Sequence, residues 1–99
     1  MSDSITYGRK QELCKILASN LATLRTKANM KQDELAERLG LSRQNISAIE
    51  NGKHEMQWST FSLLVMFFSK NIELKQIMVA MGIIDSDIER TLDIESSSK

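Results

Sequence analysis

Apolar side chains recur every three or four residues through most of the chain, which is the spacing of one buried face of an α-helix. In the central part, Leu35 and Leu39 lie on one such face, and Ile46 and Ile49 lie on another. Gly40 stands between them, and a glycine ends a helix at low cost because it adopts the left-handed conformation. The pattern therefore predicts two short helices joined by a tight turn, with one small core between them.

The start of the second of these helices carries polar side chains. Ser42 can cap the helix through its hydroxyl group. The side chains that follow face away from the shared core and form hydrogen bonds readily: they are Arg43, Gln44, Asn45 and Ser47. Arg can bond a guanine edge, and Gln or Asn an adenine edge, through paired hydrogen bonds in the major groove of DNA. This arrangement indicates a DNA-reading surface.

The same spacing predicts further helices on both sides of this central segment. A long amphipathic helix is expected over residues 10–28, and a fifth helix over residues 73–81. A fourth helix over residues 59–69, capped by Ser59, is apolar on all sides, so it is either central to the core or covered by another subunit. A Ser-x-x-Glu capping pattern predicts a short sixth helix over residues 86–94.

Composition agrees with an all-α protein of one domain. The 99 residues include no proline and only four glycines, and they are enough for one small core. We expect residues 1–8 to form a disordered tail, residues 9–70 the helix-turn-helix core and residues 71–94 the helices that complete it, before a frayed tail at residues 95–99. The first tail is also a candidate arm for a DNA groove, although it holds little positive charge.

The central segment resembles the helix-turn-helix of the lambda-repressor and Cro-type (XRE) family. The matching residues have the family's spacing: they are Gln32, Leu35, Ala36, Leu39, Gly40, Ile46, Ile49, Glu50, Gly52 and Lys53. Weaker similarity runs over residues 13–68. The resemblance implies a lambda-repressor-like domain of five helices, to which the sixth helix is an addition. It further implies a bacterial or phage transcription regulator, a repressor, that binds a near-palindromic operator in double-stranded DNA as a homodimer, with helix 43–51 in the major groove.

The resemblance also implies roles for individual side chains. Base reading would fall to Arg43, Gln44, Asn45, Ser47 and Ala48. Phosphate contacts at the two ends of the motif would come from Lys31, Gln32, Asn51, Lys53, His54 and, from the first helix, Arg25. The family pairs an Arg at the end of its first helix with a Glu at the end of the reading helix. Here these are Arg25 and Glu50, which would brace the reading helix, unless Glu50 is only a solvated acid.

Two features depart from the family pattern. Lys31 stands where the family usually has a Ser or Thr cap, and an ammonium group cannot accept a backbone N–H bond. Lys31 is either a solvated lysine or a phosphate ligand beside Gln32, where free N–H groups at a helix start suit an anion. The proline that usually follows the Gly-Lys pair is also absent, which predicts a less rigid loop.

The charge of the chain is unevenly distributed. Residues 1–70 hold ten basic and seven acidic side chains, whereas residues 71–99 hold three basic and six acidic ones, so the net charge of zero hides a positive first part and a negative second part. DNA attracts the positive part through its phosphates. We therefore expect the C-terminal part to face away from DNA.

The C-terminal part holds more apolar side chains than a five-helix core has room for. We expect the surplus to form a dimer interface, made of Met78, Met81, Ile84, Ile88 and Leu92. The alternative is that this extension folds back within one chain and covers the apolar side of the fourth helix. The acidic residues between the apolar ones would stay at a rim away from phosphate.

Other function classes have little support in the sequence. With one histidine and one cysteine, no metal site, cofactor site or catalytic set is expected, so the protein is predicted not to be an enzyme. Cys14 is expected to be a structural thiol. No apolar run reaches the length of a membrane span, so we expect a cytoplasmic, nucleoid-associated protein that a partner protein can control. The alternative function is a protein-interaction module, such as an antitoxin or antirepressor, that keeps the motif as a scaffold.

Overall fold

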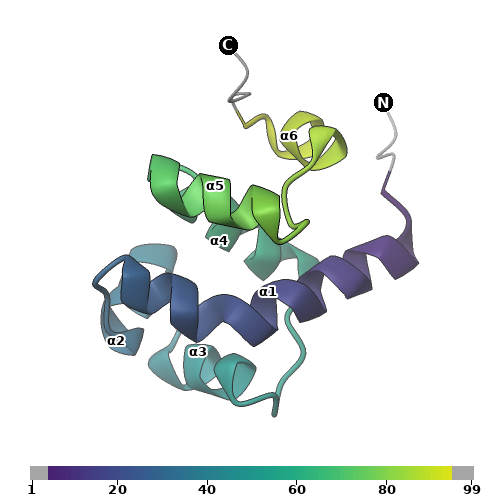
Figure 1. Ribbon diagram of the computed structural model, residues 1–99. Coiled ribbons are helices and arrows are strands. Elements are labelled where there is room, and N and C mark those ends of the chain that lie inside the picture. Colours follow the sequence, from purple (N-terminus) through teal and green to yellow (C-terminus); the bar gives the residue numbers. More distant parts are fainter. Residues whose placement is uncertain (1–4, 95–99) are drawn as a thin grey trace.

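The computed structural model describes residues 5–94, and within that range it consists of helices without strands (Figure 1). The helices are α1 (Tyr7–Lys27), α2 (Gln32–Leu39), α3 (Arg43–Glu50), α4 (Trp58–Phe68), α5 (Ile72–Ala80) and α6 (Ser86–Leu92). This confirms the expected all-α fold with a short additional C-terminal helix. Residues 1–4 of the tail expected at residues 1–8, and the tail expected at residues 95–99, lie outside the described range.

Helix α1 runs through the middle of the molecule (Figure 1). Helices α2 and α3 lie on one side of it, and α4, α5 and α6 lie on the other. Leu17, Leu21 and Leu24 are completely buried on α1, and Phe61 and Leu64 are completely buried on α4. Each fully buried side chain of this size contributes about 1.5–3 kcal/mol. This core therefore supports α2 and α3 from one side and the C-terminal helices from the other.

The first helix begins earlier than its apolar pattern predicted. It starts at Tyr7, and the hydroxyl of Thr6 accepts a hydrogen bond from the backbone N–H of Arg9 at 3.1 Å. Ile5 is buried against the core. The tail expected to extend through Gly8 is therefore wrong from Ile5 onward, because a helix cap and an apolar anchor precede the first periodic residue.

The fourth helix also begins one residue before its expected cap. Gln57 is the N-cap, so Ser59 lies inside the first turn of α4. The ring of Trp58 stacks on the ring of Phe61, with centroids 4.6 Å apart and planes inclined by 13°. This contact at the helix start explains why the first turn is placed earlier than the serine suggested.

Within the described residues, no helix is long and apolar enough to cross a membrane.

The C-terminal extension folds back within one chain. Gly82 has φ +82°, and the backbone N–H groups of Ile83 and Ile84 then donate to the carbonyl of Met78 at 2.9 and 3.3 Å. This turn directs both isoleucines inward. Helix α6 follows, with Asp85 rather than the expected serine as its N-cap, since the carboxylate accepts the backbone N–H three residues later at 2.9 Å.

This packing corrects the predicted dimer interface. Met78 and Ile88 are fully buried within one chain, and Ile84 is 3% exposed. These three side chains present no free surface to a second copy, whereas Met81 and Leu92 are half-buried. The prediction failed because apolar spacing does not reveal whether the covering surface belongs to the same chain.

Helix α6 covers the start of α1, not the outer side of α4. The guanidinium of Arg9 on α1 lies 3.3 Å from the carboxylate of Asp85 at the start of α6. Leu63 and Met66 on α4 remain 43% and 46% exposed. The alternative that the extension folds back within one chain is therefore correct, but the surface that it covers is the start of α1 and not the fourth helix.

Candidate nucleic-acid interface

The turn between α2 and α3 has the local structure that the sequence predicts. Gly40 adopts φ +70°, and the N–H of Leu41 returns to the carbonyl of Ala36 at 2.8 Å, which closes the end of α2. The hydroxyl of Ser42 then accepts the backbone N–H of Asn45 at 3.0 Å and caps α3. These local contacts fix the point at which α3 leaves the turn.

Helix α3 has one buried face and one open face. Ile46 and Ile49 are 0% and 2% exposed, because they pack into the core with α2 and α1. Arg43 and Gln44 are exposed at the start of the helix. The other three predicted base-reading residues are half-buried: they are Asn45, Ser47 and Ala48. Helix α3 thus carries all five predicted base-reading residues, and its two longest polar side chains are the most accessible of them.

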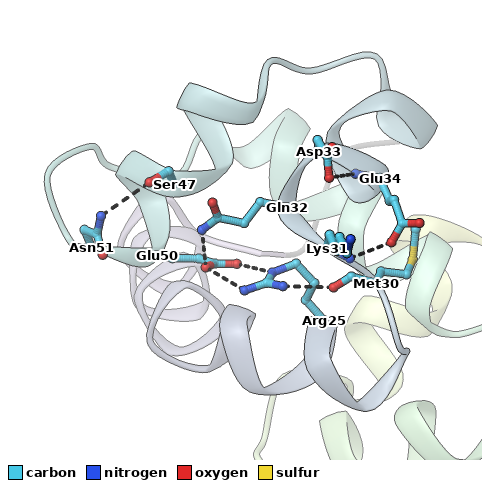
Figure 2. Close-up of polar contacts among 9 residues, drawn as sticks. All are labelled: Arg25, Met30, Lys31, Gln32, Asp33, Glu34, Ser47, Glu50 and Asn51. Atoms are coloured by element: carbon cyan, nitrogen blue, oxygen red, sulfur yellow. Dashed lines mark hydrogen bonds and ion pairs between the residues drawn. The ribbon is translucent and has the colours of Figure 1, made fainter.

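The start of α2 holds two carboxylates close to its backbone (Figure 2). The N–H of Lys31 donates to the carboxylate of Glu34 at 2.8 Å, and the N–H of Glu34 donates to the carboxylate of Asp33 at 2.9 Å. The backbone N–H groups of Lys31 and Glu34 are therefore already bonded within the helix start and are not available to an anion. The exposed Lys31 side chain remains available to a phosphate.

Three helices meet at the carboxylate of Glu50, the last residue of α3 (Figure 2). The Nε and Nη2 atoms of Arg25 on α1 donate to its two oxygens at 2.7 and 3.1 Å. Nε2 of Gln32, the first residue of α2, donates to Oε1 at 2.8 Å. Nη1 of Arg25 also donates to the carbonyl of Met30 at 2.8 Å. The side chains of Arg25 and Glu50 are only 15% and 6% exposed.

The charge state of this cluster follows from its contacts. Burial raises the pKa of Glu50, but the hydrogen bonds from Arg25 and Gln32 and the positive charge of Arg25 outweigh it, so the pKa lies below its ordinary value. The hydrogen bond to Glu50 raises the pKa of Arg25. Both groups are charged at neutral pH. The solvated-acid alternative for Glu50 is therefore wrong.

The same contacts correct one predicted role. Arg25 was expected to contact phosphate, yet three of its nitrogens already donate within the protein and its side chain is largely buried. A guanidinium held in this way cannot reach a phosphate without leaving Glu50. We therefore remove Arg25 from the phosphate-contacting set.

At the other end of α3, the chain turns sharply into the loop before α4. Gly52 has φ +74°, and the N–H of Lys53 donates to the carbonyl of Ala48 at 2.9 Å. The side-chain amide of Asn51 donates to the hydroxyl of Ser47 at 3.4 Å (Figure 2). Asn51 and Lys53 are exposed, as is His54. These residues follow the last turn of α3, and Asn51 contacts the helix through Ser47.

Comparison with known proteins agrees with this geometry. A model of the Helix-turn-helix family matches residues 21–57, from the end of α1 to the loop before α4. An uncharacterized HTH-type transcriptional regulator from Methanocaldococcus jannaschii is 37% identical over 57 residues, which cover 58% of this chain and 86% of the relative. The chain belongs to the XRE-type helix-turn-helix family of DNA-binding proteins. No solved structure matches it significantly.

Two contacts of this helix-turn-helix protein were not predicted from its sequence. The bond between Gln32 and Glu50 joins residues 18 positions apart. Arg25 contacts a backbone carbonyl at Met30, and any residue type at that position would supply the same acceptor. Only the pairing of the family's Arg and Glu pointed to this cluster.

The single cysteine of the helix-turn-helix protein, Cys14, is a buried thiol. Burial raises the pKa of the Cys14 thiol to about 11, which keeps it protonated and poorly reactive at neutral pH. Within residues 5–94, no group of three or more potential metal ligands comes together.

Proposed function

We propose that the protein is a sequence-specific DNA-binding regulator of transcription, acting as a repressor, that lays α3 in the major groove. One observation supports this proposal more strongly than any other. Arg43 and Gln44 are exposed at the start of a helix whose opposite face is completely buried. A scaffold that only bound other proteins would have no need for these base-reading side chains on a rigid helix.

In this proposal the open face of α3 reads base edges. Arg43 pairs with O6 and N7 of a guanine, and Gln44 pairs with N6 and N7 of an adenine, each with about 1–3 kcal/mol of discrimination. Asn45 and Ser47 lie behind them and contact neighbouring positions. Ala48 contacts a thymine methyl group.

Phosphate contacts come from the two ends of the motif. The Lys31 side chain lies at the start of α2, and the exposed residues after α3 lie at the other end: they are Asn51, Lys53 and His54. Such contacts set the orientation of the protein on the duplex and carry no sequence information themselves. Gln32 retains one amide N–H beyond its bond to Glu50, which a phosphate oxygen can accept.

We also propose that the protein acts as a homodimer, through side chains that one chain leaves exposed. Ile72 and Val79 are 70% and 43% exposed, and their spacing of seven places them on the same face of α5. A two-fold dimer would place two copies of α3 about 34 Å apart and require a near-palindromic operator. Ile72→Asp with Val79→Asp should then yield monomers with an unchanged helical spectrum. Wild-type protein that sediments as a monomer at working concentrations would exclude the dimer.

The test of DNA reading begins with selection of bound duplexes from a random pool, which identifies the preferred site. Arg43→Ala should remove preference at one position of that site. Lys53→Ala should weaken all duplexes alike and reduce the slope of log affinity against log salt by about 1. The two variants therefore separate base reading from phosphate contact.

Two results would contradict the proposal. If Arg43→Ala leaves affinity and site preference unchanged, α3 does not read bases. If no duplex shifts in an electrophoretic assay, the protein is better described as a protein-interaction module. The exposed Leu63 and Met66 of α4 favour that second function, since they offer an apolar surface to a partner that could also control a regulator.

A further inference from the structure

We infer that Gln32 is a positioning residue for the recognition helix and acts through Glu50, in addition to any contact that it makes with phosphate. This inference rests on the proposed function. The direct assignment of Gln32 as a phosphate ligand takes no account of the hydrogen bond that its side chain already makes within the protein.

The bond connects the start of α2 with the end of α3, which lie at opposite ends of the helix-turn-helix segment in the sequence. Gln32 is the first residue of α2 and Glu50 is the last residue of α3, and Nε2 of the former lies 2.8 Å from Oε1 of the latter (Figure 2). The same Oε1 accepts Nη2 of Arg25 at 3.1 Å. The amide therefore completes a link from α1 through α3 to the start of α2.

This link fixes the end of α3 that the turn leaves free. The turn at Gly40 and the cap at Ser42 hold the start of α3, while Ile46 and Ile49 hold its buried face. At its far end, the ion pair of Glu50 with Arg25 ties α3 to α1 but leaves motion relative to the start of α2 possible. The bond between Gln32 and Glu50 restricts that motion and keeps the first residues of α3 at a constant angle to the groove.

Restricting the pose of α3 matters more for base contacts than for phosphate contacts. A hydrogen bond to a base edge weakens steeply when its angle departs from linearity. Attraction between basic side chains and the phosphate backbone tolerates small changes in orientation and acts on every sequence. Loss of the Gln32 bond should therefore reduce the preference for the selected site, whereas loss of a simple phosphate ligand should weaken all duplexes equally.

Gln32→Met tests this difference, because methionine has a similar length but no amide donor. We expect affinity for the duplex selected from a random pool to fall about tenfold, which is within the discrimination that one good base contact gives. Affinity for an unrelated duplex should fall by a clearly smaller factor, because there only the phosphate contact of Gln32 is lost. Lys31→Met, at the neighbouring position, is the control, since it should weaken both duplexes by the same factor and leave their ratio unchanged.

A second arm needs no DNA. In a ¹³C NMR titration of the carboxyl groups, Gln32→Met should raise the pKa of Glu50, because one of the hydrogen bonds that lower it is lost. Gln44→Met makes the same chemical change on the exposed face of α3 and should leave that pKa unaltered. If Gln32→Met fails to fold, Gln32→Asn keeps the amide but is one methylene shorter, and it should give the same results.

The outcomes separate the inference from the proposed function. An equal loss of affinity for both duplexes would overturn the inference and leave Gln32 as a phosphate ligand only. An unchanged pKa of Glu50 would overturn it as well. Wild-type protein that does not distinguish the two duplexes would overturn the proposed function, and this role with it, while the titration would still report whether the bond exists.

Discussion

The ion pair between Arg25 and Glu50 should be a principal source of stability for the recognition helix. Breaking a buried ion pair by removing one partner costs about 3–5 kcal/mol, because the other charge stays buried without compensation. In Glu50→Ala, the 15% exposed Arg25 side chain keeps its bond to the Met30 carbonyl and some access to water. We therefore expect a smaller cost, about 2–3 kcal/mol.

Thermal unfolding followed by circular dichroism at neutral pH measures this cost. For a domain of this size, a loss of 2–3 kcal/mol lowers Tm by on the order of 10–20 °C. Glu12→Ala is a matched control, because Glu12 also pairs with an arginine, Arg9, but its side chain is 66% exposed. Such exposed pairs contribute little, so the control should unfold at the wild-type temperature.

A Tm of Glu50→Ala equal to that of the wild type would refute the reasoning. It would mean that Arg25 finds equivalent partners or solvent without Glu50, and that α3 is held by its apolar face alone. A loss of DNA affinity with unchanged stability would likewise show that the cluster has no structural role.

Three further predictions concern acid stability, the cap of α3 and the place of α6. The folded-state pKa of Glu50 is lowered, so the contribution of this carboxylate to stability is complete above the pKa of an unfolded glutamate, about 4.3, and is lost as the pH falls through the folded value. The difference in stability between wild type and Glu50→Gln should therefore shrink in acid. A difference that stays constant with pH would contradict the pairing. Ser42→Ala should cost about 1 kcal/mol by removing the acceptor for Asn45, as measured by urea unfolding, and an unchanged midpoint would exclude the cap. Ile88→Ala should destabilise the protein by about 2–4 kcal/mol at any protein concentration, because Ile88 is buried within one chain; a cost that appears only in a dimer would contradict this.

The sequence predicted those parts of the site that depend on local chemistry. Gly40 and Ser42 lie two positions apart in the chain, and the backbone conformation of one and the hydroxyl of the other act within a few residues. Their positions therefore set the end of α2 and the start of α3 correctly. The exposed placement of Arg43 and Gln44 followed from the apolar spacing of the same helix.

The sequence pattern did not predict contacts between residues that are distant in the chain. A glutamine at position 32 looks the same in the sequence whether its amide binds a phosphate or Glu50. Only the packing of the helices brings the side chains of Gln32 and Glu50 within 2.8 Å of each other. The apolar residues after α5 gave no sign of their covering surface for a similar reason. The turn at Gly82 decides that Ile84 packs inside the chain, and a periodic pattern does not contain that turn geometry.

The central claim, that α3 reads DNA, is tested most directly by titrating ¹⁵N-labelled protein with a duplex selected from a random pool. We expect the largest changes in amide chemical shift at residues 43–48 and at Lys53, with smaller ones at Lys31 and almost none on α5 and α6. Changes confined to α4, α5 and α6, or no changes at all, would contradict the assignment of α3 as the recognition helix.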